Sequence, residues 1–232
     1  MIDFANLGCI VLLLMMTCTL FARAAEVTAV VKIDPGSVRR VSPANVVLWL
    51  TPVDFSEPKP TPRANVRLLQ KDKQFEPHLL VIPTGTSVDF PNMDPFFHNV
   101  FSLFNGKRFD LGLYEAGSRR SVTFDREGVS YIFCNIHPEM GAVVVSLSSP
   151  WFAISDSAGT VTIRNVPPGR YRLQVWAENL SISSPTRVSE LIEVPSASYD
   201  LGNLEFHPSS DVGAHHKNKF GKDYPLQPRS NY

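Results

Sequence analysis

Short apolar runs with alternating polar positions follow one another from residue 27 to residue 194. Turn-forming Gly, Pro, Asn, Asp and Ser separate the runs, which is the pattern typical of β-strands. Strands are predicted at 27–33, 45–51, 66–70, 78–82, 87–90, 99–104, 108–113, 119–124, 129–134, 142–147, 151–155, 160–165, 171–177 and 187–194. No stretch shows sustained helical periodicity. The density of strands therefore predicts an all-β protein made of sandwiches or small barrels.

The amino-terminal segment has a different pattern. Residues 7–21 form an almost unbroken apolar run, followed by Ala22-Arg23-Ala24, a small-x-small cleavage pattern. We interpret residues 1–24 as a signal peptide and expect an exported protein without a later membrane span. Residues 1–6 contain Asp3 and no Lys or Arg, so a retained anchor or a mis-assigned start is the alternative.

Charge and cysteine content narrow the possible functions. Lys plus Arg and Asp plus Glu each number 22, so the formal net charge is zero, which argues against binding to nucleic acid or to an acidic membrane surface. Two of the three cysteines, Cys9 and Cys18, lie in the predicted signal peptide. The remaining Cys134 is then a buried filler, a reactive thiol or a metal ligand.

Cys134, His137 and Met140 share one predicted inter-strand loop at C-x2-H-x2-M spacing, and His98 begins another predicted strand. A thiolate and two imidazoles with a weak axial thioether are the ligands of a blue-copper electron-transfer site. Zinc, with water as its fourth ligand, is an alternative for the cysteine and the two histidines, although it has little use for a thioether. A fold that has lost its metal is the third interpretation.

Three sequence features resemble the cupredoxin family of blue copper proteins, of the amicyanin and plastocyanin type. They are the His98-Asn99-Val100 triplet, the loop from Cys134 to Met140, and the Val81-x3-Gly85-x2-Val88-x-Phe90-x-Asn92-x-Asp94 segment. The resemblance covers roughly residues 64–149. It implies a Greek-key β-sandwich with one type 1 copper held by His98, Cys134, His137 and Met140. It also implies that Asn99 ties the two ligand-bearing strands together by hydrogen bonds.

Other side chains near these positions have less specific interpretations. His78, at a predicted strand start, is interpreted as a hydrogen-bonded structural histidine. Phe96, Phe97, Ile136 and Pro138 flank the proposed ligands. They either cap the core or form an apolar docking patch around a partly exposed His137.

A second module follows the proposed copper unit. Its alternating segment 152–173, with a Pro168-Gly169 turn, resembles the second half of transthyretin-like, carboxypeptidase-regulatory-like sandwiches. We predict that residues 25–60 and 150–206 form one small, discontinuous sandwich around a cupredoxin domain at 61–149, with a disordered tail at 207–232. The alternative is two domains in tandem, the second of them truncated.

The sequence thus predicts an exported blue-copper protein that carries single electrons between periplasmic redox partners, whose identities it does not give. We expect no enzymatic activity, because the ligand set leaves no open coordination position and no acid–base pair is evident. A copper carrier without electron transfer is one alternative, although the predicted mature chain has only Met93 besides Met140. A structural β-sandwich protein with a vestigial metal site is the other.

Overall fold

The computed structural model describes residues 24–34, 41–103, 106–178, 180–182 (backbone only), 189–208 and 218–223. The first strands are β1 (Ala25–Ile33), β2 (Val47–Pro52), β3 (Val66–Arg67), β4 (Leu69–Lys71), β5 (Gln74–Glu76), β6 (Leu79–Pro83), β7 (Thr86–Pro91), β8 (His98–Ser102) and β9 (Phe109–Tyr114). The others are β10 (Arg119–Phe124), β11 (Gly128–Phe133), β12 (Gly141–Leu147), β13 (Phe152–Ile154), β14 (Thr160–Val166), β15 (Gly169–Trp176), β16 (Leu180–Ile182), β17 (Leu191–Val194) and β18 (Tyr199–Pro208). The predicted all-β class is confirmed. Among the described residues, no helix is long and apolar enough to cross a membrane.

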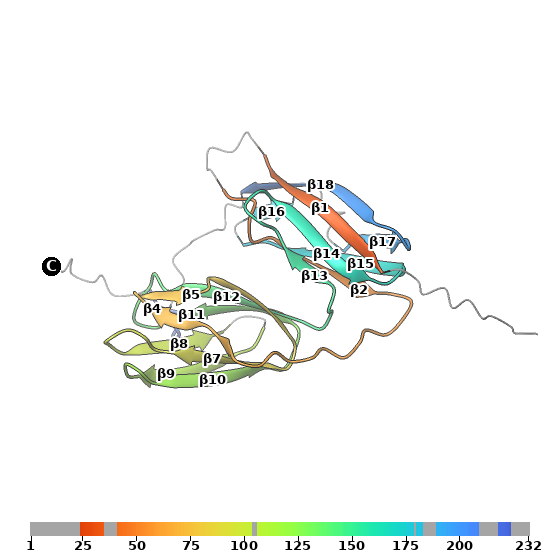
Figure 1. Ribbon diagram of the computed structural model, residues 1–232. Helices are drawn as coiled ribbons and strands as arrows, with labels where there is room; N and C mark the ends of the chain where they lie inside the picture. The colour runs from red at the N-terminus through yellow and green to blue at the C-terminus, as the bar shows by residue number, and fades with distance from the viewer. Residues whose placement is uncertain are drawn as a thin grey trace, which may run out of the picture.

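The strands form two stacked pairs of sheets (Figure 1). One sandwich pairs the sheet β14-β1-β18-β16 with the sheet β13-β2-β15-β17. We call it the outer sandwich because its strands lie on both sides of the other unit, the inner sandwich, in the sequence. Its core includes Val27, Leu48, Leu50, Tyr171 and Leu173. It therefore combines strands from before residue 53 with strands from after residue 151.

The inner sandwich pairs the sheet β10-β7-β3 with the sheet β6-β12-β11-β8-β9, and the β4-β5 hairpin adjoins it. Its core contains Phe90, Phe124 and Ile132, together with Cys134 and Met140. Every strand of this unit lies between residues 66 and 147. Cys134 and Met140, two of the predicted copper ligands, are thus part of a packed β-sandwich core.

A third apolar layer joins the two sandwiches. In β2, Leu48 and Leu50 face the outer core while Val47 and Trp49 face the other way. In β12, Val144 faces the inner core, whereas its neighbours on either side pack with Val47 and Trp49 in the third layer. Because successive side chains of a strand point to opposite faces, both strands are apolar on both faces. Their near-continuous apolar runs in the sequence reflect this double burial.

The carboxyl-terminal part differs from expectation. Strand β18 runs to Pro208, two residues into the predicted tail, and pairs in parallel with β1, which no local pattern indicated. Residues 218–223, also assigned to the tail, form a turn closed by the hydrogen bond from the Gly221 amide to the Asn218 carbonyl. The rest of the tail, and all of the predicted signal peptide except Ala24, lie outside the described residues.

Gly159 closes the turn before β14 and shows why some positions of the outer sandwich require glycine. Its φ is +83°, and a Cβ atom there would lie 2.4 Å from the carbonyl oxygen of Val31. Gly202 also has a positive φ, of +70°, but a Cβ there would meet nothing within 4 Å. An added side chain would therefore meet backbone strain at both positions, but steric overlap only at Gly159.

We expect Gly159→Ala to lower the free energy of unfolding by more than about 2 kcal/mol, since strain of about 1–2 kcal/mol adds to the backbone clash. Gly202→Ala should lose only the strain. Thermal unfolding followed by circular dichroism would show a drop in Tm of at least roughly 4–8 °C for Gly159→Ala, and a clearly smaller one for Gly202→Ala. Equal losses would contradict a role for the contact with Val31.

Candidate metal centre

His98 is the first residue of β8, and its side chain is fully buried. Asn92 shapes the loop that leads to it. The Asn92 side chain accepts a hydrogen bond from the Asp94 amide at 3.0 Å and donates one to the Phe96 carbonyl at 2.7 Å. These bonds satisfy the polar groups of a loop that has left the sheet, so the loop delivers the imidazole to one defined place.

The loop from Cys134 to Met140 joins β11 to β12. The Cys134 amide donates to the Met140 carbonyl at 3.3 Å, and the Met140 amide donates to the His137 carbonyl at 3.1 Å. Both ends of the loop are anchored in the sheet, where Phe133 pairs with Gly141. Cys134 and Met140 are fully buried in the inner core, whereas His137 is partly exposed. The loop thus turns its two sulfur side chains inward and leaves one imidazole edge near solvent.

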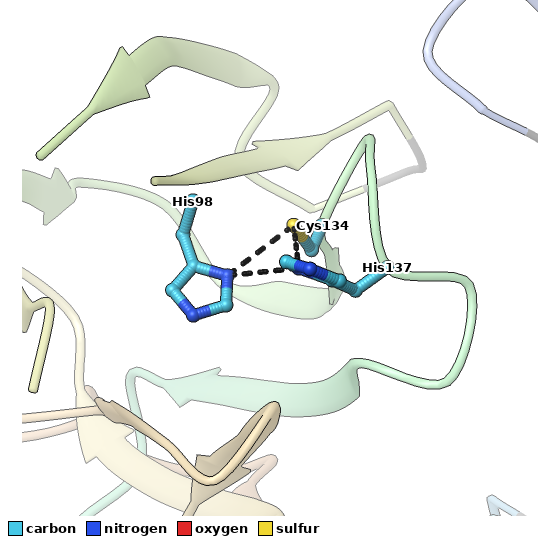
Figure 2. A group of neighbouring side chains, drawn as sticks. All are labelled: His98, Cys134 and His137. Carbon is cyan, nitrogen blue, oxygen red and sulfur yellow. Dashed lines mark hydrogen bonds between the residues drawn. The ribbon is translucent and has the colours of Figure 1, made fainter. Parts of the chain in front are cut away.

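Three donor atoms meet at this point, as Figure 2 shows. Cys134 Sγ lies 3.8 Å from His98 Nδ1 and 3.6 Å from His137 Nδ1, and the two nitrogens are 3.1 Å apart. The point equidistant from these three atoms lies about 2.0 Å from each. That value is close to the roughly 2.0–2.3 Å bonds that a first-row ion such as zinc makes to nitrogen and sulfur. The three side chains therefore fit a metal ion without rearrangement.

Hydrogen bonding determines which nitrogen of His98 faces this point. His98 Nε2 lies 2.8 Å from the Asp94 carboxylate, an acceptor, so Nε2 carries the proton and Nδ1 presents its lone pair to His137 and Cys134. A single proton among the three facing atoms can serve only one pair of them at a time. A cation at the centre would satisfy all three.

Burial adjusts the protonation of the donors. Burial raises the pKa of the Cys134 thiol, against the opposing effect of the Asn99, Ile136 and His137 amides. Burial, and next the neighbouring His98, lower the pKa of His137, which favours the neutral imidazole. A neutral imidazole is the form that binds metal, and a thiol must lose its proton to do so.

Asp94 is a part of the site that the sequence did not reveal. Its carboxylate is only 5% exposed, and it accepts hydrogen bonds from the Asp72 amide at 2.6 Å and the Lys73 amide at 3.0 Å besides the one from His98. Burial alone raises the pKa of Asp94, but the bonds from Lys73, His98 and Asp72 outweigh it and the pKa is lowered. The turn of the β4-β5 hairpin thereby holds a carboxylate against the back of His98. The sequence signal was an acidic residue four positions before His98.

Aromatic contacts close one side of the site. The Phe96 ring lies 5.2 Å from the His98 ring and 5.5 Å from the His137 ring, measured between centroids. Lys73 Nζ lies 5.7 Å from the centroid of the Phe96 ring. Phe97, the next residue, is 55% exposed. Of this pair of aromatic residues, Phe96 shields the donor atoms and Phe97 faces solvent.

Asn99 uses its backbone and side chain differently. Its backbone amide bonds to Cys134, which links the two strands that carry the donors. Its side chain instead donates to Asp110 in β9 at 2.7 Å. Asp110 also accepts from Lys219 Nζ at 2.7 Å, and the Lys219 amide donates to the Asn135 side chain at 3.0 Å. A short piece of the predicted tail therefore lies against the loop from Cys134 to Met140, which we call the donor loop.

Comparisons with known proteins give partial likenesses. No family model and no curated protein matches the chain. The chain is similar to a purple cupredoxin from Nitrosopumilus maritimus, with 27% identity, a TM-score of 0.33, and coverage of 36% of this chain and 100% of the other. It is also similar to a copper-containing nitrite reductase from Thermus scotoductus SA-01, with 24% identity, a TM-score of 0.34, and coverage of 51% and 28%. A Cu(I) form of an amicyanin variant matches with 19% identity, a TM-score of 0.34, and coverage of 43% and 98%.

Proposed function

We propose that this chain is an exported blue-copper protein that carries single electrons between periplasmic redox proteins. Its type 1 copper would be held by His98, Cys134, His137 and Met140. The observation that supports this most directly is the triangle of Sγ and two Nδ1 atoms, whose centre lies at bonding distance from all three. A thiolate and two imidazoles in one plane are the donors that a blue-copper site requires.

Met140 favours copper over zinc as the ion at this centre. Its side chain is fully buried in the same core cluster as Cys134, and its backbone is bonded to both Cys134 and His137. A thioether is a soft donor, which suits copper as a weak axial ligand and adds little for zinc. The complete donor set is thus explained by copper and only partly by zinc.

The protein contributes rigidity and shielding. Bound copper would supply a one-electron change between Cu(II) and Cu(I). Asp94 fixes the tautomer of His98, and the Asn99, Ile136 and His137 amides point at the Cys134 sulfur. Amide hydrogen bonds to a ligating sulfur stabilise its negative charge and tune the potential of the site. The partly exposed edge of His137 is the place where an electron can enter or leave.

We further propose that the protein has no enzymatic activity of its own. The four proposed donors would all come from the chain itself, which leaves no position for a substrate, and the Asp94 carboxylate beside His98 is already bonded to His98 and two amides. The outer sandwich, for which a transthyretin-like fold is our interpretation, would serve packing and contact with other proteins.

Loading the purified protein with Cu(II) tests this proposal. We expect binding of one equivalent and an intense visible absorption, because a thiolate bound to Cu(II) in a trigonal site is strongly coloured. Voltammetry should then show a reversible one-electron couple. A coloured protein without such a couple would favour the copper carrier. A colourless complex, or equal affinity for zinc with no colour from copper, would favour a structural sandwich protein.

A further inference from the structure

His78 lies where the two sandwiches meet. It directly precedes β6, the edge strand that pairs in parallel with β12. Its ring lies between β12 of the inner sandwich and Glu178, which follows β15 of the outer sandwich. Hollows of about 250 and 400 Å³ flank it, the first extending to Trp176 and Glu178, and the second to Glu139 in the donor loop. The ring is thus a bridge between the two units.

Both ring nitrogens of His78 face oxygen acceptors. Nδ1 lies 3.1 Å from the Gly141 carbonyl, and Nε2 lies 2.5 Å from the Glu178 carboxylate. A carbonyl and a carboxylate accept only, so both contacts are satisfied when both nitrogens carry protons. The bond to Glu178 accordingly raises the pKa of His78, although burial acts against it. The structure therefore favours an imidazolium held between the two sandwiches.

The contact with Gly141 is next to the donor loop. Gly141 is the first residue of β12 and directly follows Met140. The His78 carbonyl also accepts a hydrogen bond from the Val143 amide at 2.8 Å. The ring and the carbonyl of His78 thus contact Gly141 and Val143 at the start of β12, directly after Met140. We call this start of β12 the stem of the donor loop. Movement of this stem would move the methionine and, through its carbonyl, the Cys134 amide.

Glu178 is held by the outer sandwich through the strand that precedes it. Strand β15 pairs with β2 over six residue pairs and ends at Trp176, which packs into the apolar layer between the sandwiches. Val143 and Val145 of β12 pack into the same layer. The stem of the donor loop is therefore fixed by apolar packing along β12 and by the His78–Glu178 pair at its end. The charged groups Asp72, Lys73 and Glu139 line the hollow on the other side of His78.

We propose that the outer sandwich positions the Met140 end of the donor loop through Glu178 and His78, which are positioning residues of the metal centre. The effect on the metal centre rests on the proposed copper function. The positioning of the loop by Glu178 and His78 concerns the protein without metal. The outer sandwich would then be part of the redox module, because it would fix the position of Met140 relative to the other donor residues.

Hydrogen exchange of the metal-free protein tests the structural part. Glu178→Ala removes the carboxylate that contacts His78 and changes no residue of the inner sandwich. We expect the Met140, Gly141 and Val143 amides to exchange about two to five times faster in Glu178→Ala, the range for loss of a partly exposed ion pair. The control is Glu26→Ala, which removes the ion pair with Arg164 on the outer sandwich. It should leave these amides unchanged.

The copper-loaded protein provides the second measurement. Because Met140 would be the weak fourth ligand of the proposed copper site, Glu178→Ala should shift the midpoint potential and change the relative intensities of the visible bands, while Glu26→Ala should leave both unchanged. Unchanged exchange at the loop stem in a folded Glu178→Ala protein would overturn the proposal. Faster exchange with an unchanged potential would overturn its extension to the metal centre. If the wild-type protein takes up no copper, the proposed function fails, and hydrogen exchange still decides the structural part.

Discussion

A Cys134→Ser protein should fold, bind Cu(II) at least about 100 times more weakly than the wild-type protein, and show no intense visible band. Cys134 is fully buried and supplies the only sulfur at the corners of the donor triangle. A serine hydroxyl is neutral near pH 7 and a poor donor for a soft ion, whereas a thiolate binds copper strongly and produces the charge-transfer colour. Copper titration with visible and electron paramagnetic resonance spectra would measure both effects.

A matched Cys134→Ala variant separates loss of metal binding from loss of fold. Both variants lack the thiolate, so both should lack the colour. The serine hydroxyl can still accept from the Asn99, Ile136 and His137 amides, whereas alanine leaves these buried donors without an acceptor, at about 1–3 kcal/mol for each buried group left unpaired, so the alanine variant should be the less stable of the two without metal. Copper colour retained in either variant would remove Cys134 from the site and contradict the proposed function.

An Asp94→Ala protein should bind copper roughly 10 to 100 times more weakly, which is the usual effect of removing the carboxylate behind a ligating histidine. Without Asp94, nothing holds the Nε2 proton of His98, and the Asp72 and Lys73 amides lose their acceptor. Competition with a chelator of known affinity would measure the change. The His98 ring proton signals of the metal-free protein should also show a mixture of tautomers.

Asp94→Asn should lie between the wild-type and alanine proteins. An amide oxygen can still accept from His98 and Lys73, but the amide nitrogen then faces the Asp72 amide, and two donors meet. Asp89→Asn is the matched control, because Asp89 is bonded to Ser121 and Arg119 on the opposite sheet of the same sandwich. Equal losses in Asp89→Asn and Asp94→Asn would show that the effect comes from general destabilisation.

The strands were predictable where side chains alternate or are apolar throughout. The alternating pattern of β1 and the continuous apolar runs of β2 and β12 predict strands because burial on one or both faces determines residue type. The parallel pairing of β1 with β18 was not predictable, since no local signal records which distant strand completes a sheet. Strand β4 falls largely within the predicted strand at 66–70, whereas β5 was missed because three residues are too few to show a strand alternation.

Some residues of the candidate site were likewise predictable from the sequence, and others were not. Cys134 and His137 belong to one short loop, so their spacing shows that they can meet, and the structure brings them to His98. Met140 lies in the same buried core, and its role as a ligand stays a prediction. Asp94 and His78 act through partners that are distant in sequence, in the turn of the β4-β5 hairpin and just after β15, so their sequence neighbours give no indication of their contacts. Folding alone creates these contacts.

The order in which the outer sandwich is completed has a consequence for biosynthesis. Strands β1 and β2 are made first, but their partners β14, β15 and β18 follow only after the whole inner sandwich. Until then β2 has two apolar faces and no sheet, a state prone to misassembly. Once the inner sandwich has folded, its β6–β12 face offers the apolar surface on which Val47 and Trp49 pack. The unit that carries the donor residues would thus also protect the unfinished outer sandwich while the chain is being synthesised.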